Sequence, residues 1–201
     1  MPYARVMADD GVRQITDPAA LKAVAHPLRV RLLAALRESG PATATELARR
    51  LGTESGSTSY HLRVLARHGF VEDATGDRPP GRHHPRERRW RAAHLTNAWS
   101  NTALAATSEG REAAALMRRR QVEVLIGDVE RFDANLDQLD PAWVEAAGIG
   151  DLVVNLTVES LTALWDRFYA HLDALVAADA ADPSARPVSV VVAGFPRVSP
   201  R

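Results

Sequence analysis

The sequence predicts a mainly α-helical protein with a small β component, an α+β fold in two parts. Apolar residues recur at helical spacing in several segments, and most of these segments begin at capping residues and end at glycine or proline. Only four short runs are rich in residues that favour strands. The balance of charge also reverses near Leu95, which divides the chain into residues 1–95 and residues 96–201.

These two parts differ in charge, although the formal net charge of the whole chain is zero. Residues 1–95 contain 16 Lys and Arg against 10 Asp and Glu, whereas residues 96–201 contain 9 against 15. Six of the seven histidines also lie in the first part. A basic part joined to an acidic part suits a protein that places one end on a polyanion, but chance segregation would produce the same counts.

The composition of the chain excludes several kinds of site. With no cysteine among its 201 residues, the chain can form no disulfide, thiolate metal site or cysteine nucleophile. No apolar run approaches the roughly 18 to 20 residues that span a bilayer. The first 15 residues mix charges with isolated apolar residues and do not resemble a secretory signal. We therefore expect a cytoplasmic protein.

Two helices are predicted to open the first part. Asp17-Pro18 starts a short helix, because proline is favoured at a first helical position, and His26-Pro27 interrupts it. A second, amphipathic helix follows from Leu28 to Ser39, and Gly40-Pro41 ends it.

A helix-turn-helix is predicted next. The capping box Thr43-Ala44-Thr45-Glu46 starts a third helix, and Gly52 supplies the left-handed residue that turns the chain after it. The serine-rich stretch Ser55-Gly56-Ser57-Thr58-Ser59 then opens a fourth helix that ends at His68-Gly69. Two short helices around a tight turn form this motif.

The fourth helix has two different faces. Thr58, Leu62 and Leu65 fall on the side expected to pack inward. The opposite side carries hydroxyls and arginines that can donate to phosphates and base edges in a major groove, from Ser57, Tyr60, Arg63 and Arg67. A single helix of this kind is more often just solvated, but the capped helix before it and the segment after it favour DNA.

A pair of strands with a basic loop is expected after this helix. Phe70-Val71-Glu72 forms the first strand, and Arg88 to Ala92 forms the returning strand with Trp90 pointing inward. Proline and glycine keep the segment from Gly76 to Arg86 out of regular structure, and its cations can follow a phosphate backbone or enter a minor groove. We interpret this segment as a wing; a flexible basic loop without function is the alternative.

Four motifs follow one another within residues 17–92. They are His26-Pro27-Leu28-Arg29-Val30-Arg31-Leu32-Leu33, Glu46-Leu47-Ala48, Ser59-Tyr60-His61-Leu62-Arg63-Val64-Leu65 and Gly69-Phe70-Val71. Their combined spacing resembles the arsenic-repressor (ArsR) family of bacterial winged helix-turn-helix regulators. The resemblance implies a recognition helix from Ser55 to Arg67, a wing after it, and a dimer that acts as a repressor released by a ligand.

The residues expected to contact double-stranded DNA follow from this assignment. They lie on the recognition helix, at the start of the helix before it, and on the wing: Thr43, Ser55, Ser57, Thr58, Ser59, Tyr60, Arg63, Arg67, Arg82, His83, His84, Arg86 and Arg88.

The second part is predicted to contain a long helix from Thr107 to Leu139. Its apolar residues alternate steps of three and four, at Val122, Leu125, Val129, Phe132, Leu136 and Leu139. Such a stripe packs against a helix of a second copy or within its own domain, and the two are compatible. We expect a homodimer held largely by residues after Leu95, with Asp140-Pro141 ending the helix.

Two strands and a further helix are expected beyond it. Leu152 to Leu156 and Val188 to Val192 form the strands, paired with each other or exchanged between subunits, and Thr157 caps the helix between them. A small organic effector would lie among Trp143, Trp165 and Phe168, although these three could equally be plain core. This part resembles the longer ArsR-type chains that carry an added helical domain.

No cofactor, metal or catalytic activity is expected. The histidines show no cluster with metal-ligand spacing, and the motifs of serine hydrolases, phosphate-binding loops, zinc proteases and dinucleotide-binding enzymes are missing. The main alternative to a DNA-binding regulator is a winged helix that binds protein and has no DNA target. The outward arginines and the basic loop favour DNA.

Overall fold

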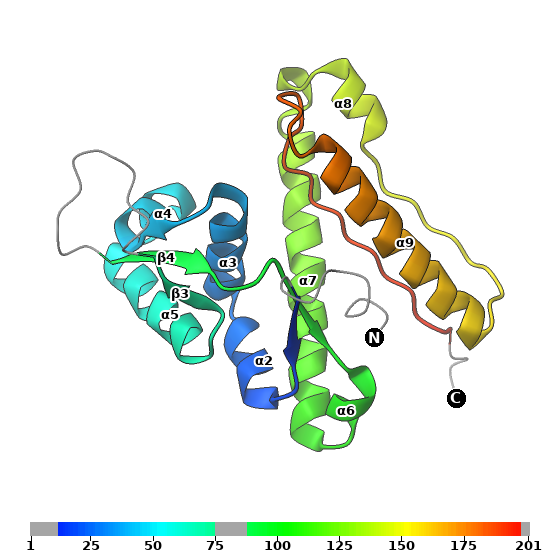
Figure 1. Ribbon diagram of the computed structural model, residues 1–201, viewed down its shortest axis with the longest axis horizontal. Coiled ribbons are helices and arrows are strands. Elements are labelled where there is room, and N and C mark those ends of the chain that lie inside the picture. The colour runs from blue at the N-terminus through cyan, green and yellow to red at the C-terminus, as the bar shows by residue number, and fades with distance from the viewer. Residues whose placement is uncertain (1–11, 75–87, 198–201) are drawn as a thin grey trace.

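The computed structural model describes residues 12–74 and 88–197. It is mainly helical with a small sheet component, as predicted (Figure 1). In chain order its elements are β1 (Val12–Ile15), α2 (Pro18–Val24), α3 (Pro27–Ser39), β2 (Ala42–Thr43), α4 (Ala44–Leu51), α5 (Ser55–Arg67), β3 (Val71–Asp73), β4 (Arg89–Ala92), β5 (Thr96–Trp99), α6 (Asn101–Ala105), α7 (Ser108–Asp133), the 3-10 helix η1 (Leu136–Gln138), α8 (Pro141–Ala146) and α9 (Val158–Asp179).

The predicted starts of α2 and α4 are confirmed by their caps. Asp17 accepts hydrogen bonds from the backbone at the start of α2, and the Thr43 and Glu46 side chains form both bonds of the capping box on α4. Gly52 ends α4 with φ 62° and ψ 43°, the left-handed conformation that allows the tight turn. One cap was not predicted: the His26 imidazole, through Nδ1, accepts from the Leu28 amide and so begins α3.

A three-stranded antiparallel sheet combines a strand before the helix-turn-helix, β2, with two strands after it, β3 and β4. Its order is β2-β4-β3, with Ala42 opposite Trp90 and Val71 opposite Ala92. The two strands predicted on either side of the wing are confirmed as β3 and β4, each within one residue of the predicted bounds, and Trp90 is buried as expected. The short strand β2 was not predicted, because two residues are too few to show a period in the sequence.

A second, parallel pair of strands joins the two predicted parts. β1 pairs with β5, with Arg13 opposite Asn97 and Ile15 opposite Trp99. Neither strand was predicted. Together with α6 and the start of α7, β5 packs onto the first part, so the division expected at residue 95 falls inside a continuous core.

This core extends to Met117. It contains side chains from α2, α3, α4, α5 and the sheet, and it is completed by Ala113, Ala114 and Met117 of α7, which packs along α2. Gly110 allows α6 and α7 to approach closely, since a Cβ there would lie 2.1 Å from the Leu104 carbonyl oxygen. The first turns of α7 are therefore part of the same packed unit as the helix-turn-helix.

The remainder of the second part is built differently from the prediction. The helix α7 ends at Asp133 rather than Leu139, and α8 begins at the predicted stop Asp140-Pro141. Residues 152–156 and 188–192 form no strand, which corrects the prediction. Figure 1 shows why they do not pair: the two segments run along opposite sides of α9, which separates their backbones.

Candidate nucleic-acid interface

The helix-turn-helix holds α5 firmly against α4 through its inward face. Leu62 and Leu65 are fully buried, and the Thr58 hydroxyl lies 3.0 Å from the Thr53 hydroxyl in the turn between the helices. These contacts fix the rotation of α5 about its axis. The face opposite them is consequently presented to solvent.

The outward face of α5 carries the side chains suited to DNA. Ser57, Tyr60, Arg63 and Arg67 are all exposed, and Tyr60 retains 58% of its exposed area although it is a large aromatic residue. Arg63 donates to the Ser59 hydroxyl at 3.1 Å and to the Ser59 carbonyl at 3.3 Å. These bonds hold the Arg63 guanidinium along the helix surface rather than free in solvent.

The N-terminus of α5 differs from those of the other helices. Every other α-helix in the described ranges has a side chain that accepts from its first turn, whereas Glu54 at the start of α5 makes no such bond. The serine-rich start was predicted to cap this helix, but Ser55 is already its first residue. The amides of its first turn thus remain available to an anion such as a DNA phosphate.

Two of the residues expected to contact DNA are instead structural. Thr43 is 3% exposed and its hydroxyl accepts from the Glu46 amide, while Thr58 has no exposed surface. A direct contact of either side chain with DNA is excluded in this conformation because both are covered and bonded within the fold. Their presence in polar motifs of the sequence does not distinguish a hydroxyl that caps a helix from one that faces a ligand.

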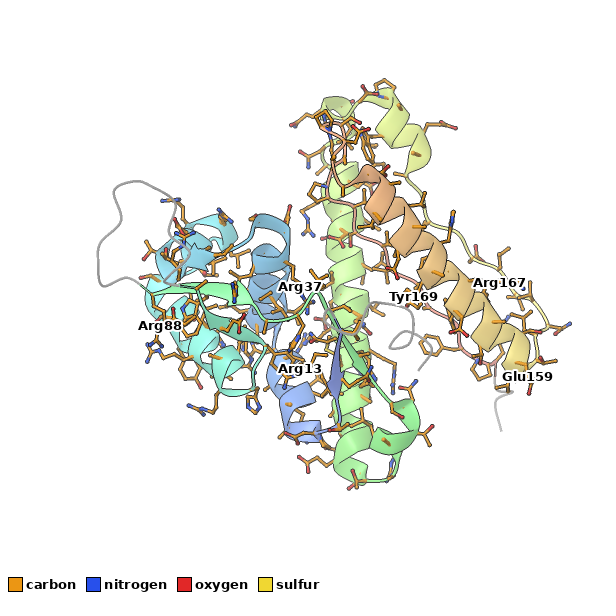
Figure 2. All side chains as sticks on the ribbon, in the orientation of Figure 1. Arg13, Arg37, Arg88, Glu159, Arg167 and Tyr169 are labelled. Carbon is orange, nitrogen blue, oxygen red and sulfur yellow. The ribbon has the colours of Figure 1, made fainter. Side chains whose placement is uncertain are left out.

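Only the end of the expected wing lies in the described ranges. Arg88, labelled in Figure 2, is exposed, pairs with Asp73 at 2.9 Å and lies over the Trp90 ring at 5.2 Å. Arg82, His83, His84 and Arg86 lie outside the described residues. Arg89, next to Arg88, points inward: it is 8% exposed and bonds to Glu46 and to the Pro41 carbonyl.

A cluster of basic side chains supports the flank of α5 and was not predicted as a unit. The His26 and His61 rings are 4.4 Å apart between centroids, and the Arg29 guanidinium lies 3.3 Å from His61 Nδ1. Arg120 of α7 donates to the neighbouring Ala25 carbonyl at 3.0 Å. Burial lowers the pKa of both histidines, and the positive charge of Arg29 lowers each pKa further. Both rings therefore favour the neutral form more strongly than a free imidazole does, at the place where α3, α5 and α7 meet.

The expected effector residues lie on two different helices. Trp143 belongs to α8, whereas Trp165 and Phe168 belong to α9, and all three are half-buried. Trp165 packs on the backbone of Gly194, where a Cβ would come within 2.7 Å of its ring, and Phe168 contacts the edge of Tyr169. A shared pocket for these three residues stays a prediction.

In residues 12–74 and 88–197 there is no group of three or more His, Asp or Glu side chains placed to hold a metal ion. Within the same ranges, every helix falls short of the length and apolar character that crossing a membrane requires.

One family model matches the chain. Residues 24–74, which run from the end of α2 through α5 to the end of β3, match a model described as a helix-turn-helix domain. No curated protein is similar enough to be matched to the chain. The family match, the confirmed helix-turn-helix and the exposed polar face of α5 together support a DNA-binding helix-turn-helix regulator.

Proposed function

We propose that this protein is a cytoplasmic, dimeric transcriptional repressor of the ArsR type that binds an inverted-repeat operator and is released from it by a small ligand. The observation that carries the proposal is the outward face of α5. Its arginines and hydroxyls are exposed, while the inward face of the same helix is locked into the core by Thr58, Leu62 and Leu65.

DNA is favoured over a protein partner by the chemistry of this face. Ser57, Arg63 and Arg67 offer donors but little apolar area, and the uncapped start of α5 adds backbone amides. Phosphates satisfy such donors at many positions along a duplex, whereas a protein interface would need an apolar centre. The extra Lys and Arg of residues 1–95 act in the same direction.

A second copy of the chain is the partner that the second part favours. Along α7, Val122 and Ile126 keep more than half of their area exposed, at 55% and 52%, and Leu125 and Phe132 are half-exposed. An apolar stripe of this size on a helix is rarely left in water. Two copies related by a twofold axis would bring two α5 helices to successive turns of one DNA face, about 34 to 36 Å apart, which calls for an inverted repeat.

The decisive experiment is binding of the intact chain to a pool of random duplexes across several salt concentrations, followed by selection of the bound sequences. We expect affinity to fall steeply as salt rises and the selected sequences to contain an inverted repeat. Absence of salt-dependent binding would instead support the protein-interaction alternative.

The roles of Arg63 and Arg88 are tested by substituting each with alanine and measuring binding to the selected duplex. Arg63→Ala should weaken binding by about 1–3 kcal/mol on the selected duplex and much less on a scrambled one, if Arg63 reads a base edge. Arg88→Ala should weaken both to a similar degree, since a residue at the wing is expected to contact phosphate. Equal loss on both duplexes for Arg63→Ala would contradict its assignment to base recognition.

A further inference from the structure

We propose that a cleft beside the C-terminal end of α5 binds a small polar anion, a carboxylate or phosphate compound, and that this anion competes with DNA for Arg67. The competition with DNA rests on the proposed function, whereas the binding of the anion to the cleft does not. This site would lie in the first part of the chain, away from the aromatic residues of α8 and α9.

The cleft has a volume of about 450 Å³ and lies where β1, the start of α2 and the end of α5 meet. Its walls are residues 13–17, Ala20 and residues 67–69. The only aliphatic side chains among them, Ile15 and Ala20, are almost wholly covered by the core, at 2% and 4% exposed. A ligand would therefore meet mostly polar groups, which favours a small hydrophilic compound over an apolar one.

Arg13 gives the cleft its charge. Its guanidinium lies 4.1 Å above the Phe70 ring, and Nη1 is shielded from solvent without a hydrogen-bond partner among the described residues. It forms no ion pair with any residue of the described ranges. Burial lowers the pKa of this group, although an arginine remains charged in any such environment. A partly desolvated cation without a counter-ion is costly, and a bound anion would offset that cost.

The other charges around the cleft leave it positive. Arg67 and His68 line it together with Arg13, and the single carboxylate of its wall, Asp17, is engaged in capping α2 through both oxygens. Outside the cleft wall, burial first and then the charges of Arg13 and Arg37 lower the pKa of His94, while Glu72 raises it. Figure 2 shows Arg13 and Arg37 in the region between the helix-turn-helix and α7.

Arg67 connects this cleft to DNA binding. It lines the cleft and is also the last residue of the outward face of α5. An anion held by Arg13 and Arg67 would draw the Arg67 side chain away from a phosphate or base and place a negative charge beside the DNA. Because coupling between two sites is reciprocal, bound DNA would lower the affinity for the anion by the same factor.

Anion binding is tested first without DNA. Thermal unfolding of the full chain is measured with citrate and with inorganic phosphate against sodium chloride of equal ionic strength. We expect at least one of the two anions to raise Tm in a saturable way, and Arg13→Gln and Arg67→Gln to abolish the rise. The matched control is Arg167→Gln, because Arg167 is exposed on α9, far from the cleft (Figure 2), and should leave the rise unchanged.

The outcomes of this first test are distinct. The proposal is overturned if neither citrate nor phosphate raises Tm more than chloride does. It is also overturned if Arg67→Gln keeps the rise in Tm. Arg67 is exposed at the end of its helix, so this variant should fold even if Arg13→Gln does not.

Release of DNA is tested next on a duplex selected by the protein itself. Saturating citrate or phosphate, at constant ionic strength, should lower the affinity of the native chain by about tenfold, a typical size for coupling between sites. The effect should vanish in Arg13→Gln. If Arg13→Gln itself weakens binding and neither anion has an effect, Arg13 is a DNA phosphate contact and the proposal is overturned. If no duplex binds but an anion raises Tm, the proposed function fails and the anion site stands.

Discussion

The described residues up to Met117 and those after it use their apolar side chains in different ways. Before this point leucines such as Leu21, Leu32, Leu47 and Leu62 have no exposed surface. After it no described residue is buried, and most residues of α9 are exposed. Because burial of apolar area is the main source of stability, the first region can hold its own shape whereas the second lacks a core of its own.

The contrast also separates two kinds of amphipathic helix. In α5 the apolar face is covered by α3 and α4 of the same chain, so its polar face is free to bind DNA. In the later turns of α7 the described residues cover the apolar face only in part, and Val122 and Ile126 stay more than half exposed, so that face itself is what remains to be bound. Similar sequence periodicity thus serves recognition in one region and, by our proposal, assembly in the other.

The largest difference between the regions is expected for leucine truncations. Leu62→Ala should lower the free energy of unfolding by about 2–5 kcal/mol, because it leaves a cavity in the core. Leu164→Ala, at a position that is 50% exposed on α9, should cost much less. Urea unfolding of both variants at low protein concentration measures this. Equal losses would show that the second region has a core after all.

Substitutions of two glycines on α7, one on each side of Met117, test where the core ends. Gly110→Ala should destabilise the protein by about 1–3 kcal/mol, since its Cβ would collide with the Leu104 backbone. Gly127→Ala should stabilise it by about 0.5–1 kcal/mol, because the nearest atom is the flexible end of Arg131 and alanine favours a helix. Thermal unfolding of the two variants should move Tm in opposite directions; a shared direction would argue against the boundary.

Charge placed on the exposed stripe of α7 should affect assembly rather than folding. We expect Val122→Asp to raise the dimer dissociation constant about tenfold or more, the equivalent of roughly 1.4 kcal/mol, because it would bury a carboxylate between two copies. Glu130→Asp, at another exposed position of α7, is the control. Sedimentation gives the constant and circular dichroism the helix content. An unchanged dimer would place the interface elsewhere.

The smallest effect is expected from pH. His26 faces Arg29 of α3, His61 of α5 and Arg120 of α7, and its pKa is lowered by burial first and then by these charges. A histidine whose folded pKa lies below its ordinary value of 6.5 stabilises the protein above that pH. This stability is lost as pH falls through the lowered pKa, when a proton on Nδ1 would also remove the acceptor that caps α3.

His26→Asn tests this pH dependence, because asparagine can still cap α3 but does not titrate. We measure the free energy of unfolding with urea above and below pH 6.5. Acidification should lower it less in this variant than in the native chain. His171→Asn, at an exposed position of α9, should behave like the native chain. If the variant lost as much stability on acidification as the native chain, His26 would not be responsible.

Local sequence signals were sufficient for the helix-turn-helix. Asp17, the capping box at Thr43 and Glu46, and the left-handed Gly52 all act within four residues of their partners, so their effects can be read from the chain. The alternation of faces on α5 was equally local. The same reasoning misplaced Thr43 and Thr58 at the DNA surface, because a hydroxyl is equally suited to a cap, a turn or a phosphate.

What only the tertiary structure decided depends on contacts between distant residues. The pairing of β1 with β5 brings together segments about eighty residues apart and thereby places Arg13 beside the end of α5. The segments at 152–156 and 188–192 have strand composition, yet α9 lies between them and leaves them without a ladder. A strand needs a neighbour to satisfy its backbone, whereas a helix satisfies its own. For this reason the sequence by itself determined helices α2 to α5 and the polar face of α5. The pairing of β1 with β5, the end of the core at Met117 and the cleft at Arg13 were decided by the fold.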